Sequence, residues 1–127
     1  MQNQKSALGM EGNVTALIGY IVGIIALVLI FIEKDNKFVR FHAIQSVLWQ
    51  VAMWVAFVVL WVVIVVLGII VSQVSTGLAT IVWLLSTLLF LLWLVALVGG
   101  IIFAAIKSYG GNMFKLPIVG NMAEKWS

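Results

Sequence analysis

Cysteine is absent from this sequence of 127 residues, and proline and histidine occur once each. The absence of cysteine excludes disulfides, thiolate zinc sites and a cysteine nucleophile. Charged residues make up only 9% of the chain and hydrophobic residues 65%, whereas a soluble domain has about 25% charged residues. A chain this small cannot bury so much apolar surface in water. The composition therefore predicts an integral membrane protein with one domain.

Residues that commonly build catalytic or metal sites are also scarce. His42 has neither a cysteine nor a carboxylate at helical spacing on its face, so we predict no metal site and no cofactor. We interpret it as bonded to Ser46 or to a neighbouring helix, with proton sensing as the alternative. Glu33 and Asp35 stand in a short loop beside three cations and are interpreted as solvated charges. No phosphate-binding loop or catalytic triad pattern is present, which predicts a protein that is not an enzyme.

The formal net charge is +3, from seven Lys and Arg against four Asp and Glu. The cations flank hydrophobic runs and never form a basic stripe. This pattern favours the lipid bilayer, with its anionic headgroups, as the partner and argues against nucleic acid.

Three long runs without charge predict an all-α fold with three transmembrane helices. The first has 19 residues, about 28 Å of helix, which matches a membrane core of about 30 Å. The other two have 29 residues each, about 43 Å, which is longer than the membrane core. In the second run, residues 43–50 are therefore expected to lie at headgroup depth. The second run follows a charged loop, Glu33 to Arg40. The expected order is a mobile tail at 1–12, helices at 14–32, 43–71 and 78–106 within a domain at 13–106, and an interfacial tail at 107–127.

Small residues recur every four positions in two of these runs. Gly19 and Gly23 share one face of the first run, and Ala96, Gly100 and Ala104 share one face of the third. Such spacing lets two helix backbones approach closely, so we predict that these two helices touch. The alternative is that glycine is simply common in membrane helices.

Three spans place Lys5 on one side of the membrane and the other six Lys and Arg residues on the other side. The positive-inside rule then predicts an external N-terminus, a cytoplasmic charged loop and C-terminus, and a multi-pass location in the cell membrane.

Two segments, Glu33 to Ser46 and Phe114 to Lys125, resemble the Tic-twenty-like family of small prokaryotic multi-pass membrane proteins. The resemblance centres on Phe-x-Arg-Phe-His-Ala-x-Gln-Ser, which ends at Ser46. The family's namesake is a chloroplast inner-envelope subunit implicated in preprotein import, usually drawn with four spans. The resemblance implies that these segments are signature surfaces, and the predicted topology places both on one side. The candidate interaction face comprises Phe38, Arg40, Phe41, His42, Gln45, Ser46, Leu116, Pro117, Gly120 and Glu124.

Arg40 has two interpretations. Its long side chain can reach lipid phosphates from the start of the second span. Alternatively, it forms a bidentate ion pair with Glu124, the one acid in the C-terminal tail.

Two functions from different classes are compatible with these features. The first is a scaffold or subunit of a membrane assembly, whose cytoplasmic face docks another membrane protein or further copies of itself. The second is an oligomeric pore or small-solute carrier. That alternative needs several chains to supply the lining, because no ionisable side chain lies within the three runs.

Overall fold

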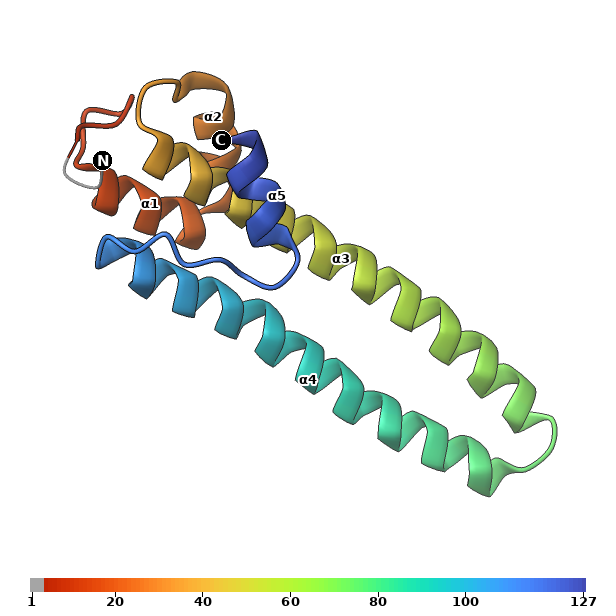
Figure 1. Ribbon diagram of the computed structural model, residues 1–127. Coiled ribbons are helices and arrows are strands. Elements are labelled where there is room, and N and C mark those ends of the chain that lie inside the picture. Colours follow the sequence, from red (N-terminus) through yellow and green to blue (C-terminus); the bar gives the residue numbers. More distant parts are fainter. Residues whose placement is uncertain (1–3) are drawn as a thin grey trace.

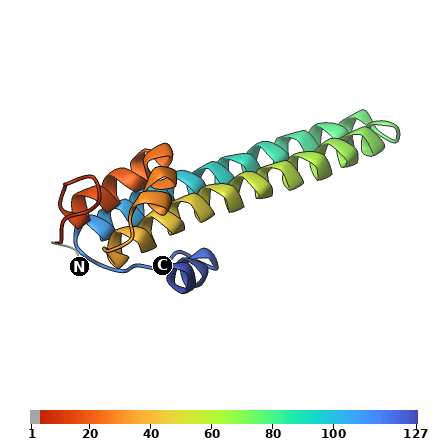
Figure 2. The ribbon, with the colours of Figure 1, turned by 90° about the horizontal axis from the view of Figure 1, so that it is seen from above.

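The computed structural model describes residues 4–127, and its regular elements over this range are five helices. Figure 1 shows two long antiparallel helices joined at their far end, while the three shorter helices, the N-terminal segment from residue 4 and the C-terminus gather at the opposite end. The view from above in Figure 2 confirms this elongated arrangement. The helices are α1 (Gly12–Ile21), α2 (Gly23–Ile32), α3 (Lys37–Ser72), α4 (Thr76–Tyr109) and α5 (Val119–Trp126).

The long hairpin of α3 and α4 contains the predicted second and third spans. The helices have 36 and 34 residues, or about 54 and 51 Å. Both are long and apolar enough to cross a membrane. Each begins at a capping side chain: Asn36 accepts from the amides of Phe38 and Val39, and Ser75 accepts from Leu78. These caps extend α3 and α4 beyond the predicted 43–71 and 78–106.

Two glycines let tryptophan rings pack between α3 and α4. A Cβ added at Gly68 would lie 2.7 Å from the Trp83 ring, and one at Gly100 would lie 2.6 Å from the Trp49 ring. The Trp49 indole also donates to the carbonyl of Leu97 at 3.3 Å. Each ring therefore occupies space that only glycine leaves free.

The prediction of one transmembrane helix over 14–32 is wrong. The chain is extended at Val22, with φ −115° and ψ 95°, and α2 folds back on α1. Gly19 faces this return, with Leu29 and Ala26 at 3.7 and 3.8 Å from its added Cβ. Each helix has 10 residues, about 15 Å, which is half of a membrane core. The first apolar run is therefore a short helical hairpin that packs on α3 and α4.

The N-terminal segment lies against the charged loop between α2 and α3. The amide of Ala7 donates to Glu33 at 2.6 Å, and the side-chain amide of Asn36 donates to the carbonyl of Gln4 at 2.9 Å. Residues 4–11, expected to form a mobile tail, thus have specific contacts, while positions 1–3 of that tail lie outside the described residues. The structure places the N-terminal segment at the same end as the loop, which differs from the predicted opposite sides.

Candidate functional site

The C-terminal tail returns along the start of α3 and ends in α5. Figure 1 shows the tail crossing from the end of α4 to α3. On α3, Phe41 and Ile44 pack with Ala123 of α5 in one buried cluster. Leu116 of the tail is also buried, with an exposed fraction of 5%. The two segments singled out in the sequence are therefore joined inside the protein.

Gln45 forms the centre of this junction. Its side-chain nitrogen donates to the Tyr20 hydroxyl at 2.6 Å and to the carbonyl of Phe114 at 2.9 Å. Its side-chain oxygen accepts from the amide of Leu116 at 2.8 Å. The amide thus uses both hydrogens and its oxygen, and it links α1, α3 and the tail.

His42 extends the same network. Its Nε2 lies 3.0 Å from the carbonyl of Asn112, and its Nδ1 lies 2.6 Å from the Tyr20 hydroxyl. A carbonyl only accepts, so Nε2 carries the hydrogen. The Tyr20 hydroxyl accepts from Gln45 and therefore donates to Nδ1, which fits a neutral imidazole. Burial raises the pKa of Tyr20 above its ordinary value, which keeps the hydroxyl protonated. Of the two partners expected for His42, the structure thus shows the neighbouring helix, through Tyr20 of α1, and adds the tail. Ser46 donates instead to a carbonyl of α1.

A second polar cluster closes the charged loop. Glu33 is buried, not solvated as expected, and its carboxylate accepts from the amides of Ala7 and Asn36. Arg40 donates through Nη1 to the carbonyls of Ile30 and Glu33 at 2.8 and 2.9 Å. These carbonyls end α2, so Arg40 caps that helix.

The alternative partner expected for Arg40 is engaged elsewhere, since Glu124 forms an ion pair with Lys115 of the tail. Both of those side chains are largely exposed, so this pair contributes little to stability.

Most of the candidate interaction face is internal. Ser46, for example, donates to the carbonyl of Gly19 at 2.9 Å, and the His42 ring touches Phe38 and Phe41 edge-on. Pro117 and Glu124 are exposed and Arg40 is half-buried. The use of these residues as a docking face stays a prediction, and burial restricts it to the exposed ones. The buried members are Phe38, Phe41, His42, Gln45, Ser46, Leu116 and Gly120.

The predicted helix-packing residues have different neighbours. Ala104 shares a buried cluster with Tyr20 of α1, so α1 and α4 touch. Gly23 instead faces the side chain of Gln50 on α3, and Ala96 is exposed. The contact between these helices therefore depends on Ala104 and aromatic neighbours rather than on two opposed glycine faces.

Sequence reasoning missed Tyr20 and the backbone groups of the tail. Tyr20 was the one aromatic residue with a hydroxyl in the first apolar run, and a buried hydroxyl needs a partner. The carbonyls of Asn112 and Phe114 carried no signal, because every residue has a carbonyl.

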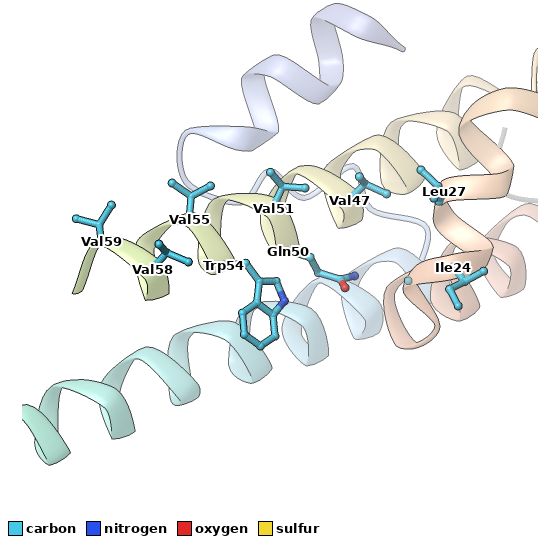
Figure 3. Close-up of a pocket in the computed structure, with 10 residues that line it drawn as sticks. Ile24, Leu27, Val47, Gln50, Val51, Trp54, Val55, Val58 and Val59 are labelled. Atoms are coloured by element: carbon cyan, nitrogen blue, oxygen red, sulfur yellow. The ribbon is translucent and has the colours of Figure 1, made fainter. Parts of the chain in front are cut away.

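An apolar groove of about 740 Å³ lies between α2 and α3. Figure 3 shows Leu27 of α2 beside Val47, with Val51, Val55 and Val59 following along α3. Gln50 is its one strongly polar side chain. The lining residues are Gly23, Ile24, Leu27, Val47, Gln50, Val51, Trp54, Val55, Val58 and Val59.

Comparison with known proteins identifies the family. A sequence model of the MamF/MmsF family, described as the magnetosome magnetite crystal formation protein family, matches residues 3–123. The chain belongs to this family. A UPF0132 membrane protein of Methanocaldococcus jannaschii is 34% identical over 97% of this chain and 94% of its own length. Another, from Archaeoglobus fulgidus, is 32% identical over 91% of this chain and 95% of its own. No solved structure matches the chain.

Membership of the MamF/MmsF family corrects the resemblance to the Tic-twenty-like family. That resemblance was wrong, because the match over residues 3–123 is to MamF/MmsF and the similar proteins are UPF0132 membrane proteins. The membrane class itself agrees with the names of the similar proteins, which are UPF0132 membrane proteins. Among residues 4–127, no group of three or more His, Asp or Glu side chains is arranged to hold a metal ion.

Proposed function

We propose that this protein is a non-enzymatic subunit of a membrane assembly. In this proposal α3 and α4 cross the membrane, and the charged end of the molecule, from which the α1–α2 hairpin reaches into the adjoining leaflet, forms a platform on the cytoplasmic side. The platform consists of the N-terminal segment, the α1–α2 hairpin, the charged loop, the tail and α5.

The observation that carries the proposal is the separation of charge along the molecule. All eleven Lys, Arg, Asp and Glu residues lie at positions 5–40 and 107–125, and none lies between them. The fold gathers both groups at one end of the hairpin (Figure 1). All seven cations then flank the membrane on one side, which the positive-inside rule favours for the cytoplasm.

The architecture supports a structural role better than a transport role. The Tyr20, His42 and Gln45 network ties three parts of the chain into one body at the charged end. No ionisable side chain occurs between residues 43 and 106, whereas transport pathways usually contain such groups.

The description of the family refers to magnetite crystals, but the charged end of this chain has few carboxylates for iron. Acids number four against seven cations, and the carboxylate of Glu33 is turned inward. We therefore propose a second copy of the chain or another membrane protein as the partner.

In-cell photocrosslinking tests this function. A photoreactive residue at Ile118 or Met122, both exposed in the C-terminal part, is expected to capture a partner or a second copy. The same residue at Val74, exposed in the far turn, is the control and is expected to capture much less protein. A strictly monomeric particle in mild detergent, with no crosslinks from any platform position, would contradict the proposal.

A further inference from the structure

We propose that the groove between α2 and α3 binds one anionic phospholipid from the leaflet on the charged side. An acyl chain lies along the valines of α3, and the phosphate lies at the cations where α2 ends and α3 begins. This inference depends on the membrane insertion proposed above and goes beyond it by assigning a ligand.

The shape of the groove fits one acyl chain. Val47, Val51 and Val55 follow at intervals of four residues, so their side chains line one face of α3. The groove extends to Val59, a helix length of about 18 Å, close to one leaflet of a core of about 30 Å. Leu27 forms the opposite wall beside Val47 (Figure 3). The surface is thus recessed along the direction in which a lipid chain lies.

Arg40 stands at the head of this groove. It precedes Val47 by seven residues, which is two helical turns on the same face of α3. Its Nη1 is bonded to the carbonyls of Ile30 and Glu33 at the end of α2, the helix that forms the opposite wall. Arg40 is half-buried, and its other guanidinium nitrogens are further donors for a phosphate oxygen.

The charges around Arg40 favour an anion. Lys37 lies one turn before it on α3 and Lys34 lies in the preceding loop, and both are exposed. The carboxylate of Glu33 accepts backbone hydrogen bonds on the inner side, so Asp35 is the exposed acid of the loop. Three cations against one exposed acid, directly above an apolar recess, match the chemistry of an anionic phospholipid.

Native mass spectrometry of the detergent-solubilised full chain tests the proposal. The probes are phosphatidylglycerol and phosphatidylcholine, each with two oleoyl chains. We expect one phosphatidylglycerol per chain, retained at least about fivefold more than phosphatidylcholine, the effect of roughly one cation near a lipid headgroup. Glycerol 3-phosphate, which lacks acyl chains, is expected not to displace the lipid.

Groove variants separate a defined site from general lipid coating. Val51→Trp and Leu27→Trp fill the groove from its two walls and are expected to reduce retention about tenfold or more, as for a blocked pocket. Val95→Trp is the matched control, because Val95 is exposed on α4, away from the groove lining. It is expected to retain the lipid as the unsubstituted chain does.

Charge variants test the headgroup contact. Lys34→Gln with Lys37→Gln is expected to remove most of the preference for phosphatidylglycerol. Lys107→Gln with Lys125→Gln makes the same change in net charge on α4 and α5 and is expected to keep that preference. We leave Arg40 unchanged in this test because it also caps α2.

Several outcomes would overturn the lipid site. They are equal retention of the two lipids, unchanged retention in both tryptophan variants, displacement by glycerol 3-phosphate, or a lipid-free dimer that buries the groove. None of these outcomes would contradict the proposed membrane topology, which cysteine labelling tests separately.

Discussion

At the scale of single residues, Gln45 determines where the end of the chain docks. A glutamine amide offers two hydrogens and one oxygen acceptor, and all of them are used by Tyr20, Phe114 and Leu116. A buried polar group without a partner is costly. The Gln45 side chain therefore stabilises the tail in its docked position and makes other positions of the tail less favourable.

Gln45→Leu is expected to detach the tail from α3. The substitution leaves the amide of Leu116 and the carbonyl of Phe114 buried without partners, which costs roughly 2–4 kcal/mol. Hydrogen exchange at the Leu116 amide and the thermal midpoint in detergent measure the effect. Gln73→Leu, in the exposed far turn, is the control with little expected change. Unaltered protection of Leu116 would contradict the role of Gln45.

Tyr20→Phe is expected to destabilise the protein by about 1–3 kcal/mol, because it removes one partner each from His42 and Gln45. Combined with Gln45→Leu, its additional cost is expected to fall well below its cost alone, since the two side chains share one network. Thermal unfolding of the two single variants and the double variant measures this coupling. Strict additivity would mean that the two residues act independently.

At the scale of elements, the α1–α2 hairpin depends on close approach at its turn. A Cβ at Gly23 would lie 2.8 Å from the side-chain oxygen of Gln50, so the turn presses directly on α3. Ala26 and Leu29 meet Gly19 across the hairpin. The lack of a side chain at Gly19 and Gly23 thus allows two short helices to pack where one longer helix was expected.

The pair Gly99 and Gly100 gives a prediction with a built-in control. Gly100→Ala is expected to destabilise the α3–α4 hairpin, because its Cβ would meet the Trp49 ring at 2.6 Å, and the ring is buried and cannot move cheaply. An added Cβ at Gly99 meets nothing within 4 Å.

Gly99→Ala is therefore expected to stabilise α4 by about 0.5–1 kcal/mol through helix propensity. Thermal midpoints of the two variants in the same detergent provide the comparison. If both substitutions stabilise the protein equally, the close packing of Trp49 on α4 is wrong.

At the scale of the whole molecule, the fold predicts that both ends of the chain and the charged loop share one side of the membrane. The sequence lacks cysteine, so single cysteines report position cleanly. Leu8→Cys and Asp35→Cys are expected to resist an impermeant thiol reagent in intact cells, whereas Val74→Cys in the far turn is expected to react.

Permeabilised cells serve as the control for the labelling experiment, because all three positions are exposed and are expected to react there. Labelling of position 8 without position 35 in intact cells would restore three spans and contradict the folded-back α1–α2 hairpin.

By itself the sequence determined the class of the protein. Low charge, long apolar runs and the position of the cations were enough to predict an all-α membrane protein, and α3 and α4 contain the predicted runs 43–71 and 78–106. These features depend on the preference of each residue type for an apolar or a polar environment, and that preference can be read from the sequence one residue at a time.

Only the tertiary structure decided the path of the first run and the partners of the polar residues. A run of 19 apolar residues suits one spanning helix and a hairpin of two short helices equally, because hydropathy reports the apolar character of a segment and not the direction of the chain. Most hydrogen bonds of three polar side chains go to backbone groups, namely those of Gln45, Glu33 and Arg40. Every residue has such groups, so the sequence does not show which of them will be the partners. Such pairings, up to 71 positions apart, arise when the chain folds, so they were not readable from local composition.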